Sequence, residues 1–332
     1  MRIFLAGDHY SGTGPANVTK YYIENLPAGT LYQKRRNKLA RIPGILINTV
    51  RADVVVYSGY SKQNILGLKA AKILKKPSAY IMHGCVEYEN GINLEPDEEM
   101  NRVERKTLEL ADRIFAVSER FCEWLKDHYP EYRDKFDHVS NGIDLSFIPD
   151  GLGSDERDPH MVFSIGGGMP RKMIRYICDA VAILREEYDP ELYLCVIGDK
   201  GADTDKIRSY GFVKDLGLVP MSETVKLFKK AALFVQNSCF ETFGLAPLEA
   251  LMCDCAMLCT KEAGALETIK SISAEDIIDR YDDPARIASK IKHLLENPNA
   301  ERLRAGIDLE SYSWISRSRV LAAKLSELVL KK

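Results

Sequence analysis

The chain has 332 residues, of which 45% are hydrophobic and 28% are charged, and its formal net charge at pH 7 is -2. This composition is typical of a globular protein of about two domains, and the small net charge argues against nucleic acid as the main partner. No apolar run approaches the roughly 20 residues that span a bilayer, and the N-terminus starts directly with a strand-like run without a signal-peptide pattern, so we expect a cytoplasmic protein.

Short apolar runs alternate with longer helical patterns along the whole chain. The predicted strands are 3–7, 54–58, 79–83, 114–118 and 138–140 in the first half, and 161–165, 193–198, 216–218, 233–236 and 256–259 in the second. The predicted helices between them are 62–74, 98–110, 172–187, 224–230 and 285–295. Because such alternation builds parallel sheets covered by helices on both faces, the sequence predicts an α/β fold.

This rhythm breaks at residues 141–160, which are rich in Gly, Pro, Asp and Ser and show no periodicity. A composition shift of this kind indicates a linker between domains. We therefore predict two doubly wound, Rossmann-like domains, 1–145 and 146–311, and a C-terminal helix at 312–332 that can pack back on the first domain. Ligands bind at the carboxyl ends of the strands in such folds, so we expect the two domains to face a common cleft.

The segment 238–251 has the composition of a ligand-binding turn between a strand and a helix. Pro247 is tolerated only in the first turn of a helix, so this helix is expected to begin near 243–245, with its free N–H groups placed to bind a diphosphate. Glu241 precedes the helix and Glu249 lies about one turn inside it. Two carboxylates suit a nucleotide sugar, which has hydroxyl groups on both sides of its diphosphate.

The spacing of Glu241 and Glu249 within S-x-x-E-x-F-G-x-x-x-x-E-A resembles the signature of the retaining family 4 glycosyltransferases, which have the GT-B fold. The segments 111–119, 141–144 and 196–199 match further parts of that family. The resemblance implies that Glu249 binds the ribose hydroxyls of the nucleotide. It also implies that Glu241 binds the transferred sugar and its phosphates together with three backbone amides, those of Phe243, Gly244 and Leu245. A pair of surface glutamates on an ordinary strand–helix unit is the alternative.

Two elements of the first half match the same family. Gly12 and Gly14 follow the first strand, where the family has a glycine-rich turn near the donor phosphates. An ordinary turn between a strand and a helix is the alternative. His83 ends a predicted strand, where the family places a histidine that touches the donor sugar and acts in catalysis. A purely structural histidine is the alternative at that position.

The sequence departs from the family pattern in the glycine-rich segment that starts at Gly166. The family usually has an arginine and a lysine here, and both neutralise the leaving diphosphate. Lys172 occupies the lysine position, but Gly167 occupies the arginine position, so Arg171 or Arg175 would have to supply the second charge. A charge that develops in the transition state needs such stabilisation, and its loss would lower the rate directly.

The resemblance implies a metal-independent, retaining transfer of a hexose from a UDP- or GDP-sugar to a glycan, lipid-linked or other hydroxyl acceptor, as in polysaccharide biosynthesis, without a cofactor. A partner subunit that binds nucleotide sugar without transferring it is the alternative, because Gly167 and Asp254 both depart from the family pattern. Neither the base, the sugar, the acceptor nor the linkage follows from the sequence.

Three cysteines lie close enough in the sequence to suggest a zinc site: Cys253, Cys255 and Cys259. Buried thiols fit the apolar residues around them better.

A cluster of basic residues in the first half runs directly into an apolar stretch, at 34–47. A segment of this kind can lie on an anionic membrane surface, such as the inner face of the cell membrane, and present the enzyme to a lipid-linked acceptor. A solvated helix face that continues into a buried one is the alternative.

Overall fold

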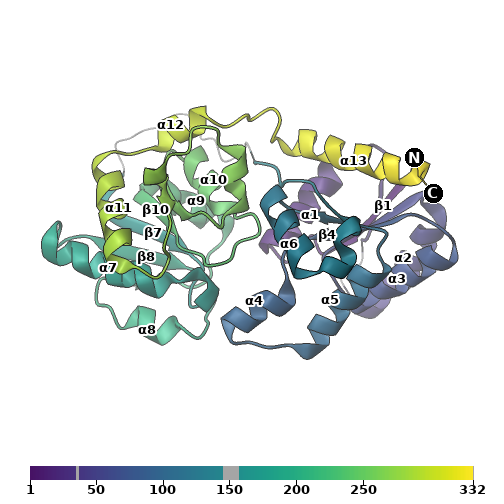
Figure 1. The fold of residues 1–332 in the computed structure, drawn as a ribbon, viewed down its shortest axis with the longest axis horizontal. Coiled ribbons are helices and arrows are strands. Elements are labelled where there is room, and N and C mark those ends of the chain that lie inside the picture. The colour runs from purple at the N-terminus through teal and green to yellow at the C-terminus, as the bar shows by residue number, and fades with distance from the viewer. Residues whose placement is uncertain (35–36, 145–156, 332) are drawn as a thin grey trace. The chain divides into compact units, whose positions relative to one another are not determined.

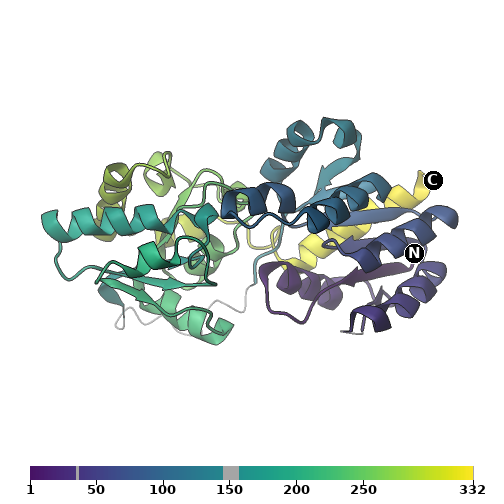
Figure 2. The same cartoon turned by 90° about the horizontal axis from the view of Figure 1, so that it is seen from below.

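A computed structural model describes residues 1–34, 37–144 and 157–331. Its internal contacts divide the chain into two units, the first made of residues 1–88, 97–142 and 309–332 and the second of residues 89–96 and 143–308. Both ends of the chain lie in the first unit (Figures 1 and 2). Within the described residues, each unit contains one six-stranded parallel sheet.

The sheet of the first unit has the strand order β2-β1-β3-β4-β5-β6. Its strands are β1 (Ile3–Gly7), β2 (Leu31–Tyr32), β3 (Val54–Ser58), β4 (Ser78–Met82), β5 (Arg113–Ala116) and β6 (Phe136–His138). The helices are α1 (Gly14–Asn25), α2 (Lys38–Arg51), α3 (Lys62–Ile73), α4 (Val86–Asn93), α5 (Glu98–Leu110), α6 (Glu119–His128) and α13 (Trp314–Leu330). A 3-10 helix at Pro130–Lys135 precedes β6.

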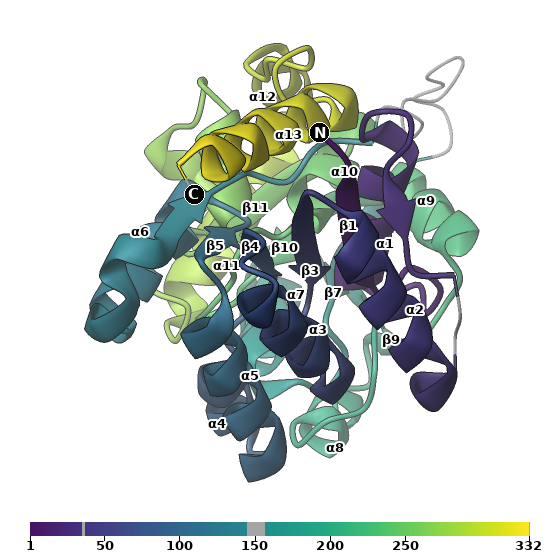
Figure 3. The ribbon, with the colours of Figure 1, turned by 90° about the vertical axis from the view of Figure 1, so that its right-hand side faces the viewer.

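Helices cover both faces of this sheet. Helices α2, α3 and α5 pack side by side on one face, and α1 packs with α13 (Figure 3). Every residue of β3 and β4 is buried, as expected for central strands of a parallel sheet. Three of these helices start where a side chain accepts a backbone N–H bond: Ser61 caps α3, Asp97 caps α5 and Ser118 caps α6.

The second unit repeats this plan with the strand order β12-β11-β10-β7-β8-β9. Its strands are β7 (Asp158–Ile165), β8 (Tyr193–Ile197), β9 (Val213–Asp215), β10 (Ala231–Gln236), β11 (Ala256–Thr260) and β12 (Ile277–Ile278). Its helices are α7 (Ile174–Glu187), α8 (Thr204–Arg208), α9 (Met221–Lys230), α10 (Ala246–Met252), α11 (Pro284–Glu296) and α12 (Ala300–Ala305). Helix α7 packs with α8 and α11, whereas α10 packs with α9 and α12.

The predicted α/β class of doubly wound sheets is confirmed, with corrections to single elements. The strand expected at 216–218 is wrong, because β9 ends at Asp215 and the apolar residues that suggested it, Leu216 and Leu218, are 48% and 75% exposed. The expected linker also ends too late, because residues 158–160 already belong to β7; its part at 145–156 lies outside the described residues. Residues 89–96, which the sequence placed in the first domain, group with the second unit.

Candidate active site

Two loops at the carboxyl edge of the second sheet carry most of the candidate residues. One follows β7 and the other follows β10, and these strands are neighbours in the sheet. The amide of Cys239 donates to the carbonyl of Arg171 over 3.0 Å, and the side-chain amide of Asn237 donates to the carbonyl of Met173 over 3.1 Å. These bonds hold the backbone around Lys172 against the loop that carries Glu241.

Glu241 lies between two cations in this site. Its Oε2 atom is 2.6 Å from Lys172 Nζ and 3.7 Å from Arg171 Nη1. The side chains are 10%, 14% and 14% exposed for Glu241, Lys172 and Arg171, so the cluster is nearly excluded from water. Two of the residues that the sequence singled out, Glu241 and Lys172, are thus direct partners, which the spacing alone did not indicate.

The charges of the cluster support one another. Burial alone would raise the pKa of Glu241, but the nearby Lys172 and Arg171 charges and the hydrogen bond from Lys172 hold that pKa below its ordinary value. Burial lowers the pKa of Lys172, which Arg171 lowers further and Glu241 raises in part. Glu241 is therefore a carboxylate at neutral pH, and it accepts hydrogen bonds.

Helix α4 supplies a second set of partners, which sequence reasoning missed. Glu89 Oε2 lies 3.3 Å from Arg171 Nη2, and Asn93 Oδ1 accepts the backbone N–H of Arg171 over 3.1 Å. Both residues belong to the segment that groups with the second unit. They lie about 80 positions before Arg171 in the chain, and no local pattern marks such a distant contact.

The geometry explains the missing arginine of the family pattern. Gly167 has a φ of +55°, and a Cβ atom there would lie 2.0 Å from the carbonyl oxygen of Asp199, so no side chain fits. A Cβ atom at Gly166 would lie 2.3 Å from Cγ of Lys172. Arg175 is bonded elsewhere, to Asp203 over 3.0 Å. Arg171 is the second cation beside Glu241.

The amides of Phe243, Gly244 and Leu245 precede α10, and no acceptor for them exists among the described residues. Gly244 has a φ of +77°, which favours glycine, and a Cβ there would lie 2.8 Å from the side chain of Gln236. Helix α10 has only seven residues, so its dipole is weaker than the sequence argument assumed. The three amides, rather than the helix, are what an anion would meet.

Glu249 lies in the first turn of α10 and differs from Glu241 in its electrostatics. Burial, assisted by the nearby Asp144 carboxylate, raises the pKa of Glu249 to about 7. Among the described residues, no side chain or backbone group donates a hydrogen bond to the Glu249 carboxylate. A ligand with hydroxyl donors would satisfy it.

The remaining predicted site residues belong to the first unit. Gly12 has a φ of +74° and lies in the turn before α1, and Gly14 is the first residue of α1; both are exposed, with open space where a side chain would be. His83 follows β4, and its Nε2 atom lies 2.8 Å from Ser58 Oγ. Burial lowers the pKa of His83 to about 4, so its ring is neutral at pH 7.

The three clustered cysteines are buried and form no disulfide, and burial raises the pKa of Cys253 to about 11 and that of Cys255 to about 12. Within the described parts of the chain, no group of three or more His, Cys, Asp or Glu side chains has an arrangement that could hold a metal ion. A search of the same residues finds no helix with the length and apolarity of a membrane span.

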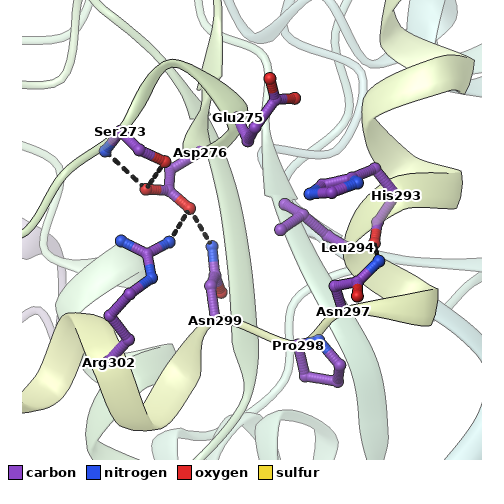
Figure 4. A pocket seen from close by; sticks show the side chains of 9 residues that line it. All are labelled: Ser273, Glu275, Asp276, His293, Leu294, Asn297, Pro298, Asn299 and Arg302. Carbon is purple, nitrogen blue, oxygen red and sulfur yellow. Dashed lines mark hydrogen bonds and ion pairs between the residues drawn. The ribbon is translucent and has the colours of Figure 1, made fainter.

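A separate hollow of about 380 Å³ lies between α11 and α12 of the second unit (Figure 4). Its lining includes Asp276, which is fully buried and accepts hydrogen bonds from Ser273, Asn299 and Arg302. Asn299 in turn binds both backbone groups of Met257 on β11. These polar groups satisfy one another's hydrogen bonds, so we interpret the network as structural. It joins the start of α12 to β11.

Comparisons with protein families agree with this architecture. Residues 3–147 match the model of glycosyltransferase family 4, and residues 150–307 match that of glycosyl transferases group 1. A D-inositol 3-phosphate glycosyltransferase of Pseudarthrobacter chlorophenolicus is 26% identical over 78% of this chain and 70% of its own length. A probable sucrose-phosphate synthase of Thermosipho melanesiensis is 23% identical over 78% of this chain and 66% of its own.

Solved structures show the same fold at low sequence identity. HepE of Anabaena, in complex with UDP and glucose, has a TM-score of 0.72 and 15% identity, and the match covers 98% of this chain and all of HepE. Sucrose-phosphate synthase of Thermosynechococcus elongatus has a TM-score of 0.70 and 16% identity over the full length of both chains. The two sheets with their helices are therefore the two Rossmann-like domains of the GT-B fold.

Proposed function

The chain is a GT-B glycosyltransferase of the family 4-like type, and on that premise we propose that it transfers a hexose from a nucleoside-diphosphate sugar to a hydroxyl acceptor with retention at the anomeric carbon. The observation that carries this proposal is the buried cluster of Glu241, Lys172 and Arg171 in the second unit. In this cluster, a carboxylate that can accept hydrogen bonds from sugar hydroxyls lies beside two cations that can bind phosphate.

The cluster can serve both ends of the ligand at once. The Lys172 ammonium has three N–H donors, and it donates one of them to Glu241 Oε2. The other two can bind phosphate oxygens, together with the amides of Phe243, Gly244 and Leu245. Glu241 can accept a hydrogen bond from a hydroxyl of the transferred sugar, and Glu249 can accept hydrogen bonds from the ribose hydroxyls. Gly166 allows Lys172 to pack against the backbone of its own loop.

In the proposed reaction, the bond between the anomeric carbon and the phosphate oxygen breaks, and the acceptor oxygen bonds to the same face of that carbon. The acceptor proton passes to the leaving phosphate oxygen. Negative charge grows on the diphosphate as it departs, so Lys172 and Arg171 stabilise the transition state more than the ground state. His83, from the first unit, and the turn at Gly12 and Gly14 are proposed to contact the donor sugar and phosphates. None of these steps requires a metal ion or cofactor.

A nucleotide-release assay tests the proposal. The protein is incubated with UDP- and GDP-sugars, with and without glycan and lipid-linked acceptors, and released UDP or GDP is measured. We expect turnover with one donor, a loss of at least 100-fold in Glu241→Gln, and no change in the surface control Glu223→Gln. Donor binding without release in the wild type would instead indicate a partner subunit that only binds nucleotide sugar.

Retention is tested separately on the product. The anomeric configuration of the transferred sugar in the glycoside product is determined by NMR early in the reaction. The same configuration as in the donor supports the proposed geometry. An inverted product would contradict it while leaving glycosyl transfer itself intact.

We also propose that the acceptor is presented at an anionic membrane surface, through the outer faces of α2 and α3. Residues 26–86 contain 11 Lys and Arg but one acidic residue, Asp53, although the whole chain has 46 basic and 48 acidic residues. Large apolar side chains on both helices are exposed by 41% to 81%: Leu39, Leu46, Ile47 and Val50 on α2, and Leu66, Ile73 and Leu74 at α3. A basic surface with exposed apolar groups suits anionic lipid.

The membrane proposal is tested by co-sedimentation with vesicles of phosphatidylglycerol and phosphatidylcholine. We expect binding at low salt that weakens as salt rises and is lost in Ile47→Glu. The control is Ile315→Glu on α13, because Ile315 is 53% exposed and Ile47 is 56% exposed. Equal binding of the two variants, or no binding to anionic vesicles at low salt, would overturn this proposal.

A further inference from the structure

Three polar groups are linked in a row at the carboxyl edge of the first sheet. Thr19 lies on α1, Ser58 ends β3 and His83 follows β4. Thr19 Oγ1 is 2.9 Å from the carbonyl oxygen of Pro15 and 2.7 Å from Ser58 Oγ. Ser58 Oγ is 2.8 Å from His83 Nε2. Because Thr19 and Ser58 are 1% and 5% exposed, solvent does not compete for their hydroxyls.

Counting protons along the row fixes its direction. A carbonyl oxygen can only accept, so the single hydroxyl proton of Thr19 goes to Pro15. Thr19 Oγ1 must then accept the proton of Ser58, and Ser58 Oγ must accept from His83 Nε2. Any other order places two oxygen lone pairs, or an oxygen and a nitrogen lone pair, against each other at hydrogen-bond distance. All three contacts are satisfied only when Nε2 carries the proton.

Gly7 makes this close approach possible. It ends β1 and pairs with Ser58 in the sheet. A Cβ atom at Gly7 would lie 2.7 Å from the Ser58 carbonyl oxygen and 3.0 Å from Thr19 Cγ2. A larger residue would therefore push α1 and β3 apart at the point where the two hydroxyls meet, so the row of hydrogen bonds depends on glycine at this position.

We infer that Thr19 and Ser58 are positioning residues that hold His83 as the neutral Nε2–H tautomer, so that Nδ1 is the hydrogen-bond acceptor of the ring. The burial that keeps the pKa of His83 low is consistent with a neutral ring. Any group that faces Nδ1 must then be a donor. Where His83 contacts the transferred sugar, which rests on the proposed function, that group is a hydroxyl, and a neutral hexose is preferred over a sugar with a carboxylate.

The tautomer is measured by NMR on protein labelled with 15N-histidine, with the His83 signals identified from His83→Gln. The chain has six histidines, so this assignment is practical. We expect a protonated Nε2 and an unprotonated Nδ1 in the wild type. Thr19→Val removes the acceptor for the Ser58 proton, which can then be donated to Nε2, so the Nδ1–H tautomer should appear. Thr19→Ser keeps the hydroxyl and should retain the wild-type tautomer.

An Nδ1–H tautomer in the wild type, or the same tautomer in Thr19→Val as in Thr19→Ser, would overturn the inference. This readout does not need turnover, so it remains decisive if the chain proves to have no transferase activity. Where activity is found, the wild type should prefer a hexose over a hexuronate donor. Thr19→Val should lower that preference about tenfold, the effect of one ordinary hydrogen bond, and an unchanged preference would contradict the assigned sugar contact.

Discussion

At the scale of single residues, Glu249 couples binding to stability through its raised pKa. Its pKa is about 7 in the folded chain and near 4.3 in an unfolded one, so the folded state holds the extra proton between these values. Stability is then full at acidic pH and falls as the pH rises through about 7. The free protein is thus less stable above pH 7 because it retains a carboxylate that, in the proposed function, binds the ribose hydroxyls.

Glu249→Gln should remove this pH dependence. We expect the variant to equal the wild type in unfolding free energy at about pH 4, near the unfolded pKa, and to exceed it by about 3 kcal/mol at pH 8, measured by urea unfolding. Its affinity for the nucleotide should fall about tenfold, measured by calorimetry. A variant that is no more stable than the wild type at pH 8 would argue against the raised pKa of Glu249.

Gly167 occupies the position at which the family pattern has an arginine, and we propose that Arg171 supplies that charge instead. Gly167→Ala should destabilise the second unit by about 2 kcal/mol, because a Cβ there meets the Asp199 carbonyl at 2.0 Å.

Arg171→Gln should lower kcat by about 100-fold if Arg171 stabilises the departing diphosphate. The control is Arg175→Gln, whose side chain pairs with Asp203 instead; equal losses of kcat in the two arginine variants would contradict the assignment.

The limits of sequence reasoning at this scale follow from contact distance. Motif spacing was enough to single out Glu241, Lys172 and Glu249, because all three lie next to strand ends or in a first helical turn. It could not choose between Arg171 and Arg175, because that choice depends on where Asp203 lies. Glu89, Thr19 and Ser58 were missed for the same reason, since their partners come from other strands and helices.

At the scale of elements, the Asp276 network anchors β12 and α12 to β11. Hydrogen bonds from Asn299 and Ser273, together with Arg302, hold the pKa of Asp276 below its ordinary value, although burial alone would raise it. The stabilisation is therefore present above pH 4 and lost as the pH falls below the unfolded value. Asp276→Asn should cost about 2 kcal/mol at pH 7, measured by urea unfolding, and the neighbouring exposed Glu275→Gln should cost almost nothing; similar losses would show that the network is not the cause.

The elements that could be predicted are those with long local signals. The central strands β3 and β8 are short apolar runs, and Pro247 marked the first turn of α10 within a few residues. Strand β9 was placed three residues late because Leu216 and Leu218 are apolar yet exposed. Strands β2 and β12 were missed, since a two-residue strand is defined by its neighbour in the sheet and has no pattern of its own.

At the scale of the whole molecule, the two parallel sheets could be predicted from the alternation of strands and helices, and the C-terminal helix was expected to pack on the first domain, but the grouping of residues 89–96 with the second unit was not expected. Residues 89–96 join the second unit, and α13 completes the first. Trp314 shows how the return is fixed: its ring stacks on Tyr21 at 4.7 Å, and it packs so tightly on Gly142 that a Cβ there would lie 2.6 Å from the indole. These contacts link positions that are far apart in the sequence.

Because each unit has its own sheet and buried core, we expect two unfolding transitions in a calorimetric scan, each sensitive to different substitutions. Trp314→Ala removes a side chain that is 5% exposed and should destabilise the first unit by about 3 kcal/mol. Asp276→Asn should shift the other transition alone. If both variants shift a single shared transition by similar amounts, the units unfold together, and the C-terminal helix stabilises the whole chain and not only the unit it completes.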